Sequence, residues 1–283
     1  MPLNLRYKWV DDLSILELIN LITVGLSTYN VKEQVPSDIG VDQQYLPSEN
    51  ILTQSHVNTL AQWTKENKMM LNGKKTKLMI INFTNNYQFS TRIHLENQLL
   101  EIIDETRLLG CVLTSDLKFH RNTEVMIKKA YTRMLILHKL YSFNISVEDL
   151  VHIYILYIRS LVEQNVAVWN HTITQEEEED IERVQKIALK VILKDEYESY
   201  HDALEITGLE NLKTRRIELC LRFAKKCLRN EKTAGMFPLN QNYDERLRNS
   251  NRYEVKFANN NRLRDSAIPA LQRMLNEDFN SNQ

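Results

Sequence analysis

The stretch "TQEEEEDIERVQKIALKVIL", residues 174–193, carries the helix signals from which the fold class of this chain can be worked out. Thr174 can accept a hydrogen bond from the amide of Glu177, whose carboxylate can reach back to the threonine, so the two residues form a capping box. The acidic run Glu176–Asp180 falls on the first turn, where the helix dipole favours negative charge. We therefore interpret this run as a capping feature and not as a metal site, and we expect a helix.

The segments on both sides of this stretch are also helical in pattern. Apolar residues at positions 127–141 form one stripe at helical spacing, and residues 147–169 read as one long apolar helix. A further amphipathic helix is expected over about residues 212–229. Tyr157 and Trp169 occupy helical positions, and we expect both side chains to lie in the core.

Strand patterns are concentrated in the first 115 residues. Residues 3–9 alternate apolar and polar side chains, which indicates a half-buried strand. A helix is expected from about residue 51, and three later segments predict a strand after a turn (71–83), a hairpin turning at Asn97-Gln98 (91–103) and a further strand (107–114). The sequence therefore predicts an α+β fold, in which short antiparallel strands and a helix precede a mostly α-helical region.

Composition places the chain among ordinary globular proteins. Of 283 residues, 43% are apolar and 26% charged, and the few glycines and prolines favour long regular elements. The net charge of −1 does not mark the whole molecule as a polyanion binder. Lysine and arginine are nevertheless concentrated in residues 118–139 and 213–232. These segments either face the phosphates of a nucleic acid or are the solvated faces of long helices.

The cysteine pattern and the apolar segments indicate in which cellular compartment the protein is expected. The three cysteines are odd in number and lack metal-type spacing, which favours a reducing environment. Residues 3–9 do not form the apolar block of a signal peptide, and the apolar stretch "ILELINLITVGL" is too short to span a bilayer. We expect a soluble intracellular protein, in the cytoplasm or nucleus, with no membrane partner.

Two adjacent aspartates stand in the stretch "YKWVDDLSILE", residues 7–17. Asp11 and Asp12 fall between two apolar segments, so they occupy the turn of a short hairpin. In a tight turn such carboxylates can meet a hard cation such as Mg²⁺, although aspartate is also a common residue of plain solvated turns.

This stretch resembles the YxDD box of reverse transcriptases, with Trp9 at the aromatic position. Further along, "NKMMLNGKKTKLMIINF" resembles the "LN-x-x-KT" segment that follows the box in non-LTR retrotransposon polymerases. "RLLGCVLTSDLKF" resembles their primer-grip segment, and the later helical stretches are similar to those of jockey-like elements. The resemblance covers roughly residues 5–276.

The resemblance implies an RNA-directed DNA polymerase that uses two Mg²⁺ ions for nucleotidyl transfer on an RNA template and a DNA primer. Residues 1–115 would be the carboxyl-terminal part of the palm, residues 116–235 a helical thumb and connector, and residues 236–283 a tail rich in arginine and asparagine. Asp11 would be a metal ligand and Asp12 its partner.

The resemblance also assigns roles to residues that follow the box. Lys75 would lie near the triphosphate, where the alternative is a solvated turn lysine. Leu109 and Gly110 would hold the primer end, and the alternative for Gly110 is a strand bulge. A basic helix would contact the template–primer backbone through five side chains: Lys118, Arg121, Lys128, Lys129 and Arg133. The alternative is that these residues form an ordinary solvated surface.

The sequence differs from those of family members in the region before the YxDD-like box. A third palm carboxylate and the fingers precede the box in family members, whereas only six residues precede Tyr7 here. We therefore expect a polymerase fragment that is inactive alone and does not hold Mg²⁺ tightly. The alternative is a non-catalytic remnant that binds nucleic acid or acts as a helical interaction module. A metal-dependent nuclease is less favoured, because no further Asp/Glu/His cluster with suitable spacing stands near Asp11.

Overall fold

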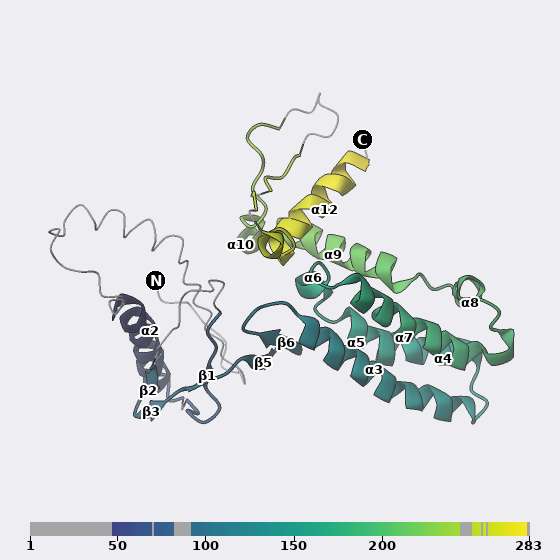
Figure 1. Ribbon diagram of the computed structural model, residues 1–283, viewed down its shortest axis with the longest axis horizontal. Coiled ribbons are helices and arrows are strands. Elements are labelled where there is room, and N and C mark those ends of the chain that lie inside the picture. The colour runs from purple at the N-terminus through teal and green to yellow at the C-terminus, as the bar shows by residue number, and fades with distance from the viewer. Residues whose placement is uncertain are drawn as a thin grey trace. The chain divides into compact units, whose positions relative to one another are not determined.

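The computed structural model describes residues 47–69, 71–81, 92–243, 251–255, 257–258 and 260–281. The chain divides into two compact units, residues 1–80 with 84–103 and residues 81–83 with 104–283 (Figure 1). The expected strand at residues 3–9 and the Asp11–Asp12 turn lie outside the described residues. Each unit is described by itself below.

The first unit is small and places one helix against a hairpin. Helix α2 (Pro47–Glu66) packs on β2 (His94–Leu95), which pairs antiparallel with β3 (Gln98–Leu99). Strand β1 (Lys77–Leu78) runs parallel to β4 (Glu101–Ile102), so the prediction of antiparallel strands was wrong for this pair. The amide of Gln54 on α2 donates to the carbonyl of His94 and accepts from its N–H, at 2.7 and 2.8 Å. This paired contact fixes the helix on the strand edge.

The core of the first unit is formed by Ile93, Leu95 and Leu100, with Leu78 packed against them. The hairpin turns one residue earlier than the sequence predicts, because Leu95 pairs with Gln98. The turn residues are therefore Glu96 and Asn97, and Glu96 has a positive φ of 54°.

The second unit begins with a hairpin where the sequence predicts one strand. Strand β5 (Glu105–Leu108) pairs antiparallel with β6 (Cys111–Thr114). The two residues between them, Leu109 and Gly110, have φ values of 48° and 85°. Glycine enters this left-handed region without steric cost, so the chain reverses here. The prediction of one continuous strand over residues 107–114 was therefore wrong.

The rest of the second unit is helical. In chain order it comprises α3 (His120–Tyr141), α4 (Val147–Ile153), a π-helical segment (Tyr154–Arg159), α5 (Ser160–Glu163), α6 (Val166–Trp169), α7 (Gln175–Leu193), a 3₁₀ turn (Lys194–Glu196), α8 (Tyr200–Thr207), α9 (Leu212–Leu228), α10 (Glu231–Ala234), α11 (Asn261–Arg264) and α12 (Ala267–Ser281).

Helix α7 lies at the centre of this unit. It packs along α3 and also contacts α4, α8 and α9, while α12 packs on α9 and α6 (Figure 1). The contacts bury large apolar side chains, including Leu137, Ile158, Ile181, Leu189 and Ile192. Full burial of such a side chain contributes about 1.5–3 kcal/mol, so the helices are stabilised mainly by packing against one another.

The expected capping box is confirmed. Thr174 accepts from the N–H of Glu177, and the Glu177 carboxylate accepts from the N–H of Thr174 at 2.8 Å. Helix α9 also agrees with the segment that the sequence predicts. The expected single helix over residues 147–169 is instead interrupted, because Asn165 takes a left-handed conformation with φ 55° and separates α5 from α6.

The described residues are rich in helix and carry only short sheets, which fits the α+β class. Within these residues, no helix combines the length and the apolar character that crossing a membrane requires. All three cysteines, Cys111, Cys220 and Cys227, are free and buried.

Candidate nucleic-acid interface

The tip of the β5–β6 hairpin is exposed but firmly held. Leu109 is 79% exposed as a residue, while its carbonyl accepts a hydrogen bond from Nδ2 of Asn165 at 3.0 Å. A Cβ at Gly110 would overlap the side-chain amide of Gln164, so the backbone approaches the α5–α6 junction closely. The φ of this position favours glycine, and the tip presents an apolar side chain to solvent.

A cluster of cations lies beside the hairpin on the surface of α3. Lys129 is exposed, and Arg107 on β5 and Arg133 one turn along α3 are close enough to act on its charge. Loss of hydration, followed by repulsion from these two arginines, lowers the pKa of Lys129 below its usual range. Throughout the described part of the chain, none of the three forms an ion pair with a carboxylate. We call Arg107, Lys129 and Arg133 the basic face.

Arg133 is fixed in place by the π-helical segment. Its Nη1 donates to the carbonyl of Tyr157 at 2.6 Å, and its guanidinium lies 4.2 Å from the centre of the Tyr157 ring. Tyr157 itself is 41% exposed, so the expectation that it lies in the core was wrong. The same expectation is confirmed for Trp169, which is fully buried and donates from Nε1 to the carbonyl of Gln164 at 2.8 Å.

Two more of the cations that were expected to contact the nucleic-acid backbone are instead paired with carboxylates of this chain. Lys118 lies 3.7 Å from Asp116, and Arg121 pairs with Glu105 at 3.2 Å and with Glu124 at 2.6 Å. The hydrogen bond and the charge of Glu124 raise the pKa of Arg121. These pairs already satisfy the cations, so Lys118 and Arg121 offer less to an incoming phosphate than the basic face does.

Lys128 and Lys75 are both exposed lysines. Lys128 is adjacent to the basic face in sequence and lines a groove between α3 and α7. Lys75 belongs to the first unit, in a turn that Asn72 closes by accepting the Lys75 N–H. Lys75 therefore belongs to a different unit from the hairpin tip and α3. Asp11 and Asp12, the expected Mg²⁺ ligands, lie outside the described residues.

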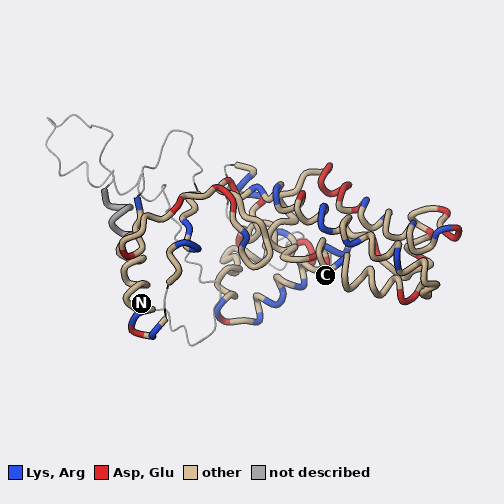
Figure 2. The backbone as a smooth tube through the Cα atoms, turned by 90° about the horizontal axis from the view of Figure 1, so that it is seen from below, with Lys and Arg blue, Asp and Glu red and all other residues tan. Residues whose placement is uncertain are grey.

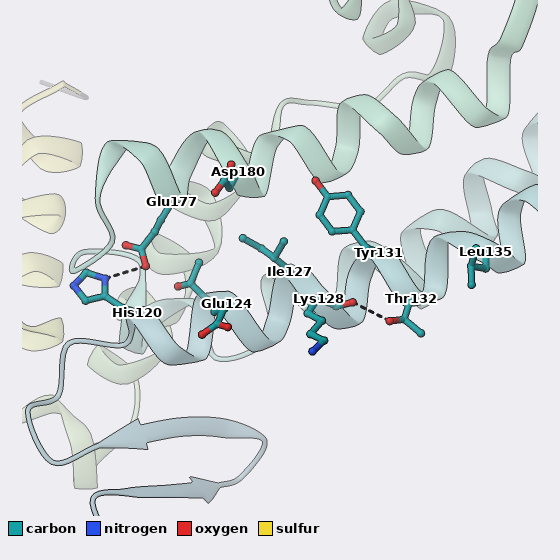
Figure 3. A pocket seen from close by; sticks show the side chains of 10 residues that line it. His120, Glu124, Ile127, Lys128, Tyr131, Thr132, Leu135, Glu177 and Asp180 are labelled. Atoms are coloured by element: carbon teal, nitrogen blue, oxygen red, sulfur yellow. Dashed lines mark hydrogen bonds and ion pairs between the residues drawn. The ribbon is translucent and has the colours of Figure 1, made fainter.

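The groove between α3 and α7 has a volume of about 630 Å³ (Figure 3). Ile127 and Tyr131 point from α3 toward α7, whereas Lys128 points away from it. At one end the ring of His120 hydrogen-bonds the Glu177 carboxylate, Nδ1 to Oε1, at 2.9 Å. The groove thus combines an apolar floor with a polar, largely acidic rim, and no group of three or more potential metal ligands occurs among the residues that the structure describes.

Acidic and basic positions interleave along the helices of the second unit (Figure 2). A cation can therefore be judged only by its neighbours, and the useful distinction is whether a carboxylate lies beside it. By this criterion Arg107, which sequence reasoning missed, belongs with Lys129 and Arg133. Its position in a strand next to the LG turn was a signal that could have found it.

Comparison with known proteins adds no relative: no protein-family model, curated protein or solved structure matches this chain.

Proposed function

We propose that the second unit binds the phosphate backbone of a nucleic-acid duplex through the basic face, as the thumb of an RNA-directed DNA polymerase of the non-LTR retrotransposon class. The observation that carries the proposal is the set of three neighbouring cations without carboxylate partners in the described residues. Their mutual repulsion costs free energy, and an anion bound between them would remove that cost. Phosphate oxygens are the anions that closely spaced lysine and arginine side chains bind best.

The hairpin tip supports the interpretation of the basic face as part of a polymerase. Leu109 and Gly110, which resemble a primer grip in sequence, form an exposed turn in the same unit as the basic face. An apolar side chain at such a tip can pack on the last base pair of a duplex, whose outer face is not stacked. Catalysis would further need Asp11 and Asp12 to hold Mg²⁺, which would activate the primer hydroxyl and stabilise the departing pyrophosphate.

The size of the effect follows from the number of cations. Three neutralised phosphates give a slope of about −2.7 for the logarithm of affinity against the logarithm of salt concentration. Raising the salt fourfold, from about 50 to 200 mM, should then weaken binding about 40-fold. A surface that only carries solvated lysines would show a much smaller dependence.

The test is fluorescence anisotropy of the full chain with a labelled RNA–DNA hybrid over a range of salt. Lys129→Gln should reduce the slope by about one unit and weaken binding at low salt. Lys139→Gln is the matched control, because Lys139 is an exposed lysine in the last turn of the same helix. Salt-independent binding, or equal effects of the two variants, would contradict the proposal.

Primer extension with Mg²⁺ addresses the catalytic part separately. We propose that the chain alone binds the hybrid without extending the primer. Template-dependent synthesis that Asp11→Ala abolishes would show instead that this chain catalyses primer extension through Asp11.

A helical interaction module is the second candidate, and the groove between α3 and α7 favours it. Leu135 lines this groove and is 61% exposed, and Ile127 and Tyr131 line it from the same helix. Such a groove would accept the apolar face of a partner helix. Failure of the hybrid to bind at low salt would favour this candidate over the first.

A further inference from the structure

Two polar residues at the α5–α6 junction hold the tip of the β5–β6 hairpin. Asn165 donates from Nδ2 to the carbonyl of Leu109 at 3.0 Å, and the side chain of Gln164 lies against Gly110. The carbonyl of Gln164 in turn accepts from Nε1 of the fully buried Trp169. The hairpin tip is therefore connected through Gln164 to the core of the helical unit.

The backbone conformation at position 165 does not by itself explain why the residue there is an asparagine. Its φ of 55° and ψ of 25° lie in the left-handed region, which asparagine tolerates and glycine adopts more easily. The feature that glycine would lack is the side-chain amide, and that amide makes the bond to Leu109. Asn165 thus adopts the left-handed conformation that separates α5 from α6, and its side chain also binds the hairpin.

The same segment also reaches the basic face. The π-helical segment Tyr154–Arg159 continues into α5, which ends at the junction that holds the hairpin. Within it, the Tyr157 carbonyl and ring fix Arg133. Residues 154–165 therefore contact the basic face at one end and the hairpin tip at the other. π-Helical turns are rare and occur often at functional sites.

We propose that Gln164 and Asn165 are positioning residues that set the register between the basic face and the hairpin tip, so that the end of an RNA–DNA hybrid rests on Leu109 while its backbone lies on the basic face. This inference rests on the proposed function and adds to it the two residues that position the hairpin tip for a duplex end. The apolar Leu109 side chain offers nothing to a phosphate, but it can cover the outer face of a terminal base pair.

The test compares two hybrids of equal length, one with open ends and one closed by loops at both ends. The full chain should bind the open hybrid more tightly. Asn165→Gly keeps the left-handed backbone and removes the amide, and Asn165→Asp keeps the size but places a carboxylate against the Leu109 carbonyl. Both variants should lower affinity for the open hybrid about threefold to tenfold, the range expected for one hydrogen bond.

Affinity for the closed hybrid and the salt slope should stay unchanged in these variants, because the basic face is intact. Asn144→Gly is the matched control, since Asn144 has a φ of 54° in the α3–α4 turn and should leave both hybrids unaffected. Circular dichroism verifies folding, and Gln164→Ala replaces Asn165→Gly if that variant does not fold.

The outcomes separate the two proposals. An end preference that survives Asn165→Gly, Asn165→Asp and Gln164→Ala overturns the positioning role, while salt-dependent binding of the closed hybrid that Lys129→Gln weakens would still support the proposed function. Absence of that salt-dependent binding would overturn both. Equal affinity of the full chain for open and closed hybrids would overturn the inference alone.

Discussion

The N-terminus of α9 is capped by a carboxylate from another helix, and we expect its removal to destabilise the second unit. Glu182 on α7 accepts from the N–H of Leu212 at 3.0 Å and from the N–H of Lys213 at 3.2 Å. It also accepts from the hydroxyl of Tyr200 on α8. One side chain therefore connects α7, α8 and α9, and Glu182→Gln tests this connection without changing its size.

The expected loss is about 2 kcal/mol. Replacing one oxygen by an amide nitrogen leaves one N–H of α9 facing a donor, which costs about 1–2 kcal/mol. Loss of the negative charge at the helix N-terminus adds about 0.5–1 kcal/mol. For a unit of this size the melting temperature should fall by about 2–4 °C for each kcal/mol.

The measurement is urea and thermal unfolding of the full chain, followed by far-ultraviolet circular dichroism. Glu179→Gln is the matched control, because Glu179 is an exposed residue of the same helix whose carboxylate accepts a hydrogen bond from Gln175 and caps no other helix among the described residues. It should change stability by less than about 0.5 kcal/mol. If Glu182→Gln and Glu179→Gln unfold at the same midpoint, the capping carboxylate contributes nothing and the reasoning fails.

Two further predictions concern acid stability and the hairpin tip. Burial, followed by the charge of Arg273, lowers the pKa of His171 from 6.5 to about 4. The folded state thus holds His171 neutral, so stability is full above about pH 6.5 and should fall by up to about 3 kcal/mol as the pH drops toward 4. Urea midpoints against pH should show this fall, and His171→Gln should flatten it; a profile that His171→Gln leaves unchanged contradicts the assignment. Gly110→Ala must place a Cβ at φ 85° and displace the amide of Gln164. We expect thermal unfolding to show a loss of about 1–2 kcal/mol, and a variant as stable as the parent would refute the strained turn.

The helices could be predicted where their signals are local. The Thr174–Glu177 capping box depends on residues three apart, and it forms as expected. The turn at Leu109–Gly110 was missed because "RLLGCVLT" is mostly apolar and its glycine was also compatible with a strand bulge. The break at Asn165 was missed for the same reason, since the apolar pattern continues on both sides of it.

The candidate site could be predicted only in part. The sequence named Lys129 and Arg133 together with Lys118 and Arg121, but it could not tell which of these cations face carboxylates. Contacts between β5 and α3 make that distinction, because Glu105 pairs with Arg121 while Arg107 acts on Lys129.

Local sequence patterns account for the helical character of residues 116–235, the start of α7 and the extent of α9, because spacing along a helix and capping depend on neighbours in the chain. Tertiary contacts establish which charges stay uncompensated, why Asn165 interrupts the helix and what holds the hairpin tip. Those properties depend on side chains brought together from distant segments. Asn165 and Leu109, separated by 56 positions, are joined by a hydrogen bond in the folded unit, in which α3 packs against α5.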